Sequence, residues 1–260
     1  MPLHVVATPI GNLGDLSPRA REVLTTSALV LCEDTRHTRK LYAALGLAAP
    51  PLQSCHAHNE TERLGQVLDL LGQGREVALV SDAGTPAMSD PGGRLVEAVH
   101  RAGFPVRTVP GPSSVVAALS VSGLPTAPSH FLGFPPRKGR ARWIAEASRL
   151  AGTLVMLEAG NRAGRLVAEL AAALPDREAC LCRELSKLHE EVLRAPLSAL
   201  PTDPQRGEVV LVVGPGAAIR DEAPVGEGLK AAAALLAPRW GISKSAAYQR
   251  LLSLDASGEE

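Results

Sequence analysis

Short apolar runs alternate with helical patterns through residues 1–121, and this alternation constrains the fold more than any other feature. Apolar runs typical of buried strands are Leu3–Thr8, Ala28–Cys32, Val77–Val80 and Val106–Val109. Helical patterns lie between them, as at Arg19–Thr26, where Ser17 and Pro18 are the predicted N-cap and first helical residue. Strands that alternate with helices are typical of a mostly parallel sheet, so we expect an α/β domain here.

The pattern changes after residue 121. Ser122–Ser129 is rich in proline and glycine, which is typical of a domain junction. A helix is predicted at Asn161–Leu174, and the predicted strands are Phe131–Phe134, Thr153–Glu158, Ala179–Cys182, Glu191–Arg194 and Glu208–Val213, with the last two paired antiparallel. Gly214–Gly228 is typical of a linker, and Leu229–Leu254 predicts two short helices, the second capped by Ser243. We therefore expect an N-terminal α/β domain at 1–121, a second α/β domain at 122–216, and a linker with a helical extension at 217–260.

Charge and cysteine content exclude several classes of protein. Lysine plus arginine and aspartate plus glutamate both number 27, which argues against a wholly basic nucleic-acid wrapper but not against a local basic patch. The cysteines form no CxxC pair, and His56 and His58 lack a third ligand nearby, so we expect no metal. Cys180 and Cys182 alternate within an apolar run, which favours reduced thiols on one buried strand face. No signal peptide and no apolar run of about 18 residues is evident, so we expect a cytoplasmic protein without membrane association.

Three loops rich in small residues follow predicted strands. They are Pro9–Asp15, Ser81–Pro86 and Pro110–Ser114. Ligands bind α/β sheets at the carboxyl ends of strands, where small residues allow close approach and free N–H groups at a helix start hold polar atoms. A plain turn, or simple capping by Ser113, explains the same residues without a ligand.

Two capping signatures predict where helices begin. Asp90 and Pro91 are the expected N-cap and first residue of one helix. Asn59 with Glu62 three residues on resembles a capping box for a helix at Glu60–Leu71.

Two polar segments are candidates for chemistry or for binding a polyanion. Glu33–Lys40 is entirely polar and follows an apolar strand directly, so it is either a solvated helix start or a surface for a polyanion and a proton transfer. Arg137–Arg142 carries a second basic group. Neither a dinucleotide or P-loop signature nor a nucleophile elbow occurs, which disfavours NAD, FAD, P-loop and hydrolase chemistry.

These segments occur in the order seen in one family of proteins. They are TPIGNLGD, EDTRHTRK, HAHNE, VALVSDAGTPAMSDPG, VPGPSS, GFPPRKGR, RELSKLHEE and RGEVVLVV. Together they resemble the bacterial small-subunit ribosomal RNA cytidine 2′-O-methyltransferases, which belong to the S-adenosylmethionine-dependent tetrapyrrole methylases. The resemblance covers about residues 3–214. It departs at Leu157–Arg162, where the family usually has an aromatic residue and a Ser-Pro-His-Arg run, so only Glu158 and Arg162 match there.

The resemblance implies a two-domain, tetrapyrrole-methylase-like α/β fold. The N-terminal domain would hold a mostly parallel sheet and the second a mixed sheet, followed by a small helical C-terminal tail. It also implies S-adenosylmethionine folded in the cleft between domains, and a homodimer that methylates a cytidine ribose in the decoding region of 16S rRNA in the small ribosomal subunit. The cofactor-binding positions that match are Pro9, Ile10, Gly11, Asp82, Ala83, Gly84, Thr85, Ser113, Ser114, Met156, Leu157, Glu158, Glu184, Leu185 and Glu208.

Methyl transfer to a ribose hydroxyl needs a general base, because the hydroxyl is a poor nucleophile until its proton leaves. The candidate bases are Glu33, Asp34, His37, His58 and Glu184. The catalytic set also includes Arg36 and Lys187, the latter to stabilise a developing alkoxide. Structural roles stay open for these residues. Asp34 is equally suited to pair with Arg36, and Glu184 with Arg183. Lys187 is equally suited to be an ordinary surface lysine.

RNA binding would depend on local charge. The basic side chains proposed to contact phosphates are Arg39, Lys40, Arg137, Lys138, Arg140 and Arg142. Phe131, Phe134 and Trp143 are candidates for stacking on bases, although apolar packing is the commoner role of the phenylalanines. Two alternatives remain: a methylase of a small tetrapyrrole on the same fold, and a non-catalytic RNA-binding module.

Overall fold

The computed structural model describes residues 1–56, 59–216 and 225–255. The chain forms two compact units, Met1–Pro215 and Gly216–Glu260, and each is described by itself. The first unit contains two five-stranded sheets.

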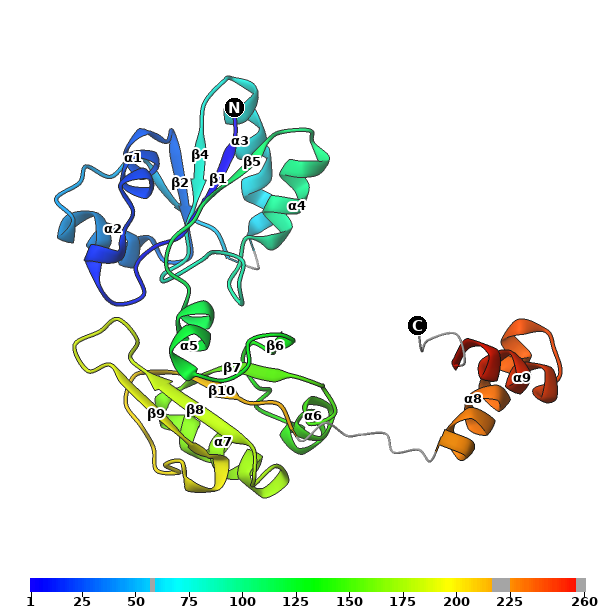
Figure 1. The fold of residues 1–260 in the computed structure, drawn as a ribbon. Helices are drawn as coiled ribbons and strands as arrows, with labels where there is room; N and C mark the ends of the chain where they lie inside the picture. Colours follow the sequence, from blue (N-terminus) through cyan, green and yellow to red (C-terminus); the bar gives the residue numbers. More distant parts are fainter. Residues whose placement is uncertain (57–58, 217–224, 256–260) are drawn as a thin grey trace. The chain divides into compact units, whose positions relative to one another are not determined.

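The first sheet is entirely parallel, as the alternation of strands and helices predicts. Its strands are β1 (Leu3–Val6), β2 (Leu29–Cys32), β3 (Leu52–Ser54), β4 (Val77–Leu79) and β5 (Val106–Val109), and they lie in the order β3-β2-β4-β1-β5 (Figure 1). Because β1 pairs with both β4 and β5, the carboxyl ends of these three strands are neighbours at one edge of the sheet.

Helices cover both faces of this sheet. They are α1 (Pro18–Thr26) and α2 (Thr35–Ala44) on one face, and α3 (Glu60–Gly72) and α4 (Gly93–Arg101) on the other (Figure 1), while a short 3-10 helix, η1 (Leu13–Asp15), follows β1. Side chains alternate along the strands, so Leu31 packs in a core with α3 and α4 and Val30 packs in a core with α1 and α2. The Ser17 side chain caps α1 and Pro18 is its first residue, as predicted.

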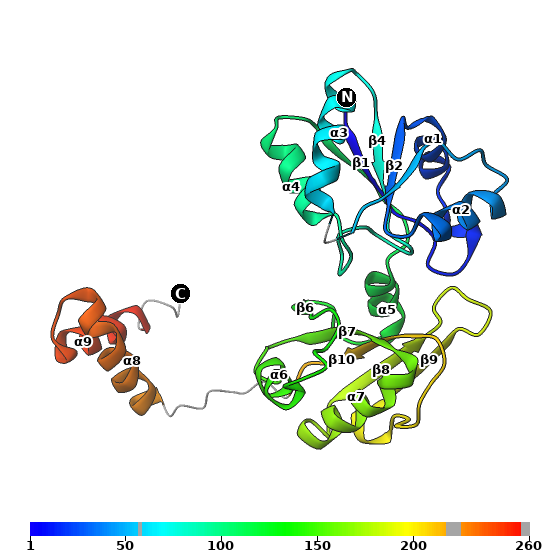
Figure 2. The ribbon, with the colours of Figure 1, turned by 180° about the vertical axis from the view of Figure 1, so that it is seen from behind.

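The second sheet is mixed, which also agrees with the prediction. Its strands are β6 (Ser129–Phe131), β7 (Thr153–Ala159), β8 (Glu178–Arg183), β9 (Glu191–Pro196) and β10 (Glu208–Val213), in the order β6-β7-β10-β8-β9. Only the β6–β7 pair is parallel. One face packs on α6 (Arg140–Ala147), α7 (Gly160–Ala173) and the 3-10 helix η2 (Leu197–Ala199), and Figure 2 shows α7 lying across that face.

The opposite face of the second sheet is covered by α5 (Ser114–Ser122). Ala118 on this helix is fully buried in a core with Val155, Cys180 and Val212. The domain boundaries drawn from the sequence stay predictions, but this packing places α5 with the second sheet. We therefore propose that the first boundary lies near residue 113 rather than after residue 121.

One predicted helix cap is wrong, and a second is right in position only, since Asn59 is the N-cap residue of α3 but makes no capping hydrogen bond. The helix after Asp90 begins at Gly93 with Gly92 as its N-cap, because Gly92 adopts a left-handed conformation (φ 115°) against Leu79. The side chain of Asn59 does not cap α3. Its oxygen accepts a hydrogen bond from the N–H of His56 and its amide donates to the carbonyl of Ser54, so it closes the preceding loop instead.

The second unit holds two helices, α8 (Val225–Trp240) and α9 (Lys244–Asp255). Ala233, Ala237 and Ala247 form its small buried core. The Ser243 hydroxyl accepts a hydrogen bond from the N–H of Ala246, which confirms the predicted cap of the last helix. Throughout the described residues, no helix has the length and apolar character needed to cross a membrane.

The packing of α7 generates a stability prediction. A Cβ added at Gly164 would overlap the backbone carbonyl groups of Thr202 and Asp203, so Gly164→Ala should lower the free energy of unfolding by about 1–3 kcal/mol. Gly65→Ala is the matched control, because Gly65 is exposed on α3 with nothing within 4 Å of an added Cβ. Alanine should stabilise that helix by about 0.5–1 kcal/mol. Urea unfolding followed by circular dichroism measures both, and an equal response of the two variants would contradict the close approach.

Candidate functional site

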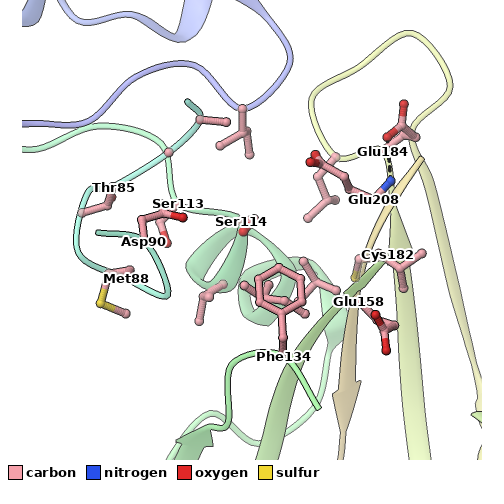
Figure 3. A pocket seen from close by; sticks show the side chains of 18 of the residues that line it. Thr85, Met88, Asp90, Ser113, Ser114, Phe134, Glu158, Cys182, Glu184 and Glu208 are labelled. Atoms are coloured by element: carbon pink, nitrogen blue, oxygen red, sulfur yellow. Dashed lines mark hydrogen bonds between the residues drawn. The ribbon is translucent and has the colours of Figure 1, made fainter. Parts of the chain in front are cut away.

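A cavity of about 280 Å³ lies within the first unit, between the loops at the carboxyl ends of β1, β4 and β5 and one face of the second sheet. Its position agrees with the general rule that open α/β sheets bind ligands at the carboxyl ends of their strands. Most of the predicted cofactor-binding residues and the predicted catalytic residue Lys187 line it, namely Ile10, Asp82, Ala83, Gly84, Thr85, Ser113, Ser114, Leu157, Glu158, Glu184, Leu185, Lys187 and Glu208. Figure 3 shows Thr85, Met88 and Asp90 of the loop after β4 on one side of the cavity, and Cys182, Glu184 and Glu208 on the other.

Three of the predicted cofactor-binding residues do not line this cavity. Met156 is fully buried in the core beneath α7, because it and Leu157 point to opposite faces of β7 and only Leu157 reaches the cavity. Pro9 and Gly11 lie just outside. A Cβ added at Gly11 would overlap the side chain of Lys187, so this glycine lets the loop after β1 approach the loop after β8.

Sequence reasoning missed part of the lining. The additional residues are Met88, Asp90, Val115, Phe134, Ala159, Cys182, Val209 and Val210. Because the Asp90-Pro91 pair resembles a helix cap, Asp90 was not predicted to line the cavity. Cys182 and Cys180 lie on one buried strand face with their sulfur atoms 3.7 Å apart, as predicted, and all four cysteines are free thiols.

The loop after β4 is held in place by backbone contacts from its neighbours. Thr8 and Gly84 exchange two backbone hydrogen bonds of 2.9 and 3.0 Å, and the Thr85 hydroxyl donates to the carbonyl of Pro112. Asp82 accepts a hydrogen bond of 3.1 Å from the N–H of Asp34. The loops after β1, β2, β4 and β5 therefore form one connected rim.

The wall formed by the second sheet contains a lysine between two carboxylates. The Lys187 ammonium lies 2.8 Å from Glu184 and 3.0 Å from Glu208, and Glu184 also accepts the N–H of Glu208 (Figure 3). The hydrogen bond from Lys187 lowers the pKa of the Glu184 carboxyl. Burial alone would lower the pKa of Lys187, but its two carboxylate partners raise it overall. Arg183 pairs with Glu191 instead of Glu184.

Glu158 is buried and fully compensated by arginines. Its carboxylate contacts Arg140 at 3.2 Å and Arg162 at 2.6 Å, and accepts the N–H of Ala159. The Arg140 side chain is only 11% exposed and also pairs with Glu169. This places Arg140 in a buried network rather than on a surface open to a polyanion.

The polar segment Glu33–Lys40, which follows β2, lies at the rim and does not line the cavity. Asp34 is the N-cap of α2 and pairs with Arg36 at 2.7 Å, and these hydrogen bonds hold the pKa of Asp34 well below its usual range. Desolvation and the nearby charges of Asp82, Asp90 and Asp34 raise the pKa of Glu33.

The remaining basic candidates are exposed at the surface. His37, Arg39 and Lys40 lie on α2, and Arg137 and Lys138 lie in the loop before α6. Arg142 is 88% exposed and pairs with Glu146 one turn along α6. The candidate base His58 lies outside the described residues, and among those that are described no three His, Cys, Asp or Glu side chains form a group that could hold a metal ion.

The different environments of two neighbouring arginines give a second prediction. Arg140→Met should destabilise the protein by on the order of 3 kcal/mol, because Glu158 would keep a buried charge that is only partly paired. Arg142→Met should leave the unfolding midpoint unchanged, since exposed pairs contribute little. Denaturant unfolding compares the two variants, and equal midpoints would show that Arg140 does not belong to a buried network.

Known proteins are similar to this chain over most of its length, and a family model matches most of its first unit. Residues 2–201 match the family described as Tetrapyrrole (Corrin/Porphyrin) Methylases. A protein of Xylella fastidiosa named "Ribosomal RNA small subunit methyltransferase I" is 46% identical over 235 residues, which are 87% of this chain and 85% of the relative. A Pseudomonas aeruginosa protein of the same name is 41% identical over 272 residues, covering 96% of each chain.

Solved structures are similar in fold. The uroporphyrin-III-C-methyltransferase of Thermus thermophilus has a TM-score of 0.57 and 25% identity, covering 82% of this chain and 94% of that one. A structure titled as the Thermus thermophilus enzyme complexed with S-adenyl homocysteine has a TM-score of 0.56 and 20% identity, with 82% and 97% coverage. At 20% identity, the latter similarity concerns the fold alone.

Proposed function

The chain belongs to the family of tetrapyrrole (corrin/porphyrin) methylases, and we propose that it transfers a methyl group from S-adenosylmethionine to ribosomal RNA of the small subunit. The observation that carries this proposal is the 46% identity to an rRNA methyltransferase over 87% of the chain. We further propose, from the motif resemblance, that the acceptor is the 2′-hydroxyl of a cytidine in the decoding region of 16S rRNA.

The runner-up function is methylation of a small tetrapyrrole. It is supported by the family name and by structural neighbours that are tetrapyrrole methyltransferases. Those neighbours are 25% identical or less, whereas the curated relatives named as rRNA methyltransferases reach 48%. The larger similarity favours RNA as the acceptor.

The cavity fits the chemical groups of S-adenosylmethionine. Its volume of about 280 Å³ is close to the lower end of ligand pockets, which is roughly 300 Å³. Ile10, Leu157 and Val210 offer apolar surface to an adenine ring, and the N–H groups of the first turn of α5, which begins at Ser114, lack intrahelical partners and can donate to polar atoms. Carboxylates on the wall suit a ligand with positive charges. We propose that these residues hold the cofactor.

When bound, S-adenosylmethionine supplies an electrophilic methyl group on a positively charged sulfur. The protein must position the acceptor hydroxyl and remove its proton. Asp34 and Glu184 are already engaged by Arg36 and Lys187, which keeps both carboxylates ionised and weakly basic. Glu33 directly precedes Asp34, whose N–H binds Asp82 of the cavity lining, and it has no cation within ion-pair distance among the described residues. Its raised pKa also suits a proton acceptor, so we propose Glu33 as the base.

A methyl-transfer assay tests this function. Labelled S-adenosylmethionine should transfer its methyl group to assembled small subunits and not to a precorrin, and nucleoside mass spectrometry should find 2′-O-methylcytidine. Glu33→Gln should reduce transfer and leave cofactor affinity unchanged, with exposed Glu62→Gln as the matched control. Label in the precorrin would favour the runner-up, and cofactor binding without any transfer would favour an RNA-binding module.

The exposed basic groups give a separate prediction about RNA binding. If Arg137 and Lys138 each contact a phosphate of a single strand, removing both should reduce the slope of log affinity against log salt by about 1.4. The control is Arg75→Gln with Arg101→Gln, because exposed Arg75 precedes β4 and exposed Arg101 ends α4, and neither lines the cavity. Filter binding to small-subunit RNA measures both slopes. An unchanged slope for the Arg137 and Lys138 variant would remove this loop from the RNA surface.

The homodimer rests on the resemblance, and both it and the cytoplasmic location stay part of the proposal. Arg39 and Lys40 are proposed to extend the RNA surface from α2, since both are exposed on the rim that flanks the cavity. Arg140 is left out of that surface because its side chain is buried between Glu158 and Glu169.

A further inference from the structure

The carboxylates that line the cavity differ in how their charge is compensated. Glu158 contacts two arginines, and Glu184 and Glu208 share Lys187. Asp82 accepts a neutral backbone N–H. Asp90 has no cation within ion-pair distance in the described part of the chain, so it leaves negative charge on the wall formed by the loop after β4.

The surroundings of Asp90 do not relieve this charge. The residue is half-buried and, like Ser113, lines the cavity (Figure 3). Burial raises the pKa of its carboxyl, the Ser81 hydroxyl lowers it, and Asp82 and Glu208 raise it further. Glu33, at the rim, adds another negative charge nearby. Since half-burial of an unpaired carboxylate is unfavourable, a cation in the cavity would stabilise this arrangement.

The backbone holds Asp90 in this position. Ala87 and Ser89, on its N-terminal side, both adopt left-handed conformations (φ 63° and 70°), which non-glycine residues seldom do. On its C-terminal side, the N–H of Gly92 donates a hydrogen bond of 2.9 Å to the buried carboxylate of Glu60. A loop with two such residues persists only when its surroundings impose it, so the position of Asp90 is not a consequence of local preference.

We propose that Asp90 is the residue by which the cavity prefers the positively charged methyl donor over the product formed from it. This inference rests on the proposed function. Donor and product share the same adenosine, ammonium and carboxylate groups. In the transfer the S–CH₃ bond breaks with its electron pair left on sulfur, an O–CH₃ bond forms, and the hydroxyl proton goes to the base. The sulfur thereby changes from a cation to a neutral thioether.

Asp90 would distinguish donor from product only through this difference in the charge of the sulfur. A carboxylate several ångströms from a cation in a protein cleft changes the affinity for it by about tenfold or more, and has little effect on a neutral sulfur. Binding of the donor would be strengthened and release of the product would be favoured. Asp90 would then determine the specificity of the cavity for the charge of its ligand, without taking part in the chemistry.

Calorimetry with S-adenosylmethionine and S-adenosylhomocysteine tests the inference. Asp90→Asn, which keeps the shape of the side chain, should weaken donor binding about tenfold and product binding by less than about twofold. Asp69→Asn is the matched control, because it removes one charge from the exposed face of α3, remote from the cavity, and should leave both affinities unchanged. Equal unfolding midpoints would show that the variants fold alike.

The pH dependence gives a second readout. Protonation removes the negative charge, so the preference of the wild type for the donor should fall as pH decreases through the raised pKa of Asp90, and should stay flat in Asp90→Asn. A donor-to-product affinity ratio unchanged by Asp90→Asn would overturn the inference, and so would an equal loss of both ligands. Wild-type protein that binds neither ligand would instead contradict the proposed function itself.

Discussion

The parallel pairing of β1 with β4 on one side and β5 on the other is the constraint on which the site depends. Parallel neighbours end at the same edge of a sheet, so the three loops that follow these strands must meet there. The two hydrogen bonds between Thr8 and Gly84 then join two of the loops directly, and Thr85 joins the third through Pro112. Residues far apart in the chain thus form one wall, because strand pairing brings the loops together and these hydrogen bonds join them.

Charge compensation divides the site into two parts with different roles. On the second sheet, Glu158 contacts two arginines, whereas Glu184 and Glu208 share one lysine, so only part of their charge is compensated within the protein. On the first sheet, Asp82 and Asp90 lack such partners among the residues that the structure describes. Negative charge is therefore available to a ligand mainly on the wall that carries Asp82 and Asp90, with a smaller share from the Glu184–Glu208 pair, which favours a ligand with a cationic group.

Local patterns in the sequence were sufficient for every strand except β3, for most helices and for the loops that line the cavity. The predicted pairing of β9 with β10 is wrong, because β8 lies between these two strands. Ser81–Pro86 and Pro110–Ser114 follow apolar runs, and a strand end is visible in a few adjacent residues. Alternation along β7 also predicts two faces, but it does not say which one meets the cavity, and so Met156 and Leu157 could not be distinguished.

Interactions between distant residues could not be predicted in this way. Arg140 pairs with Glu158 and Glu169, which are 18 and 29 residues away, and within the motif it is indistinguishable from the exposed Arg137 and Lys138. Asp90 precedes a proline and resembles a cap, while the actual cap is Gly92, whose conformation depends on contact with Leu79. In both cases the outcome was decided by tertiary packing rather than by local propensity.

The position of α5 has a consequence for how the protein responds to any occupant of the cavity. The first residues of this helix line the cavity, and its remaining length covers β8 and β10. A ligand that binds at the helix start therefore opposes local unfolding of the helix, and with it exposure of the second sheet. Hydrogen exchange of the amides in β8 and β10 should slow when the cavity is filled, including the amides of residues that do not line the cavity. The helix makes the two sheets thermodynamically coupled through their shared ligand.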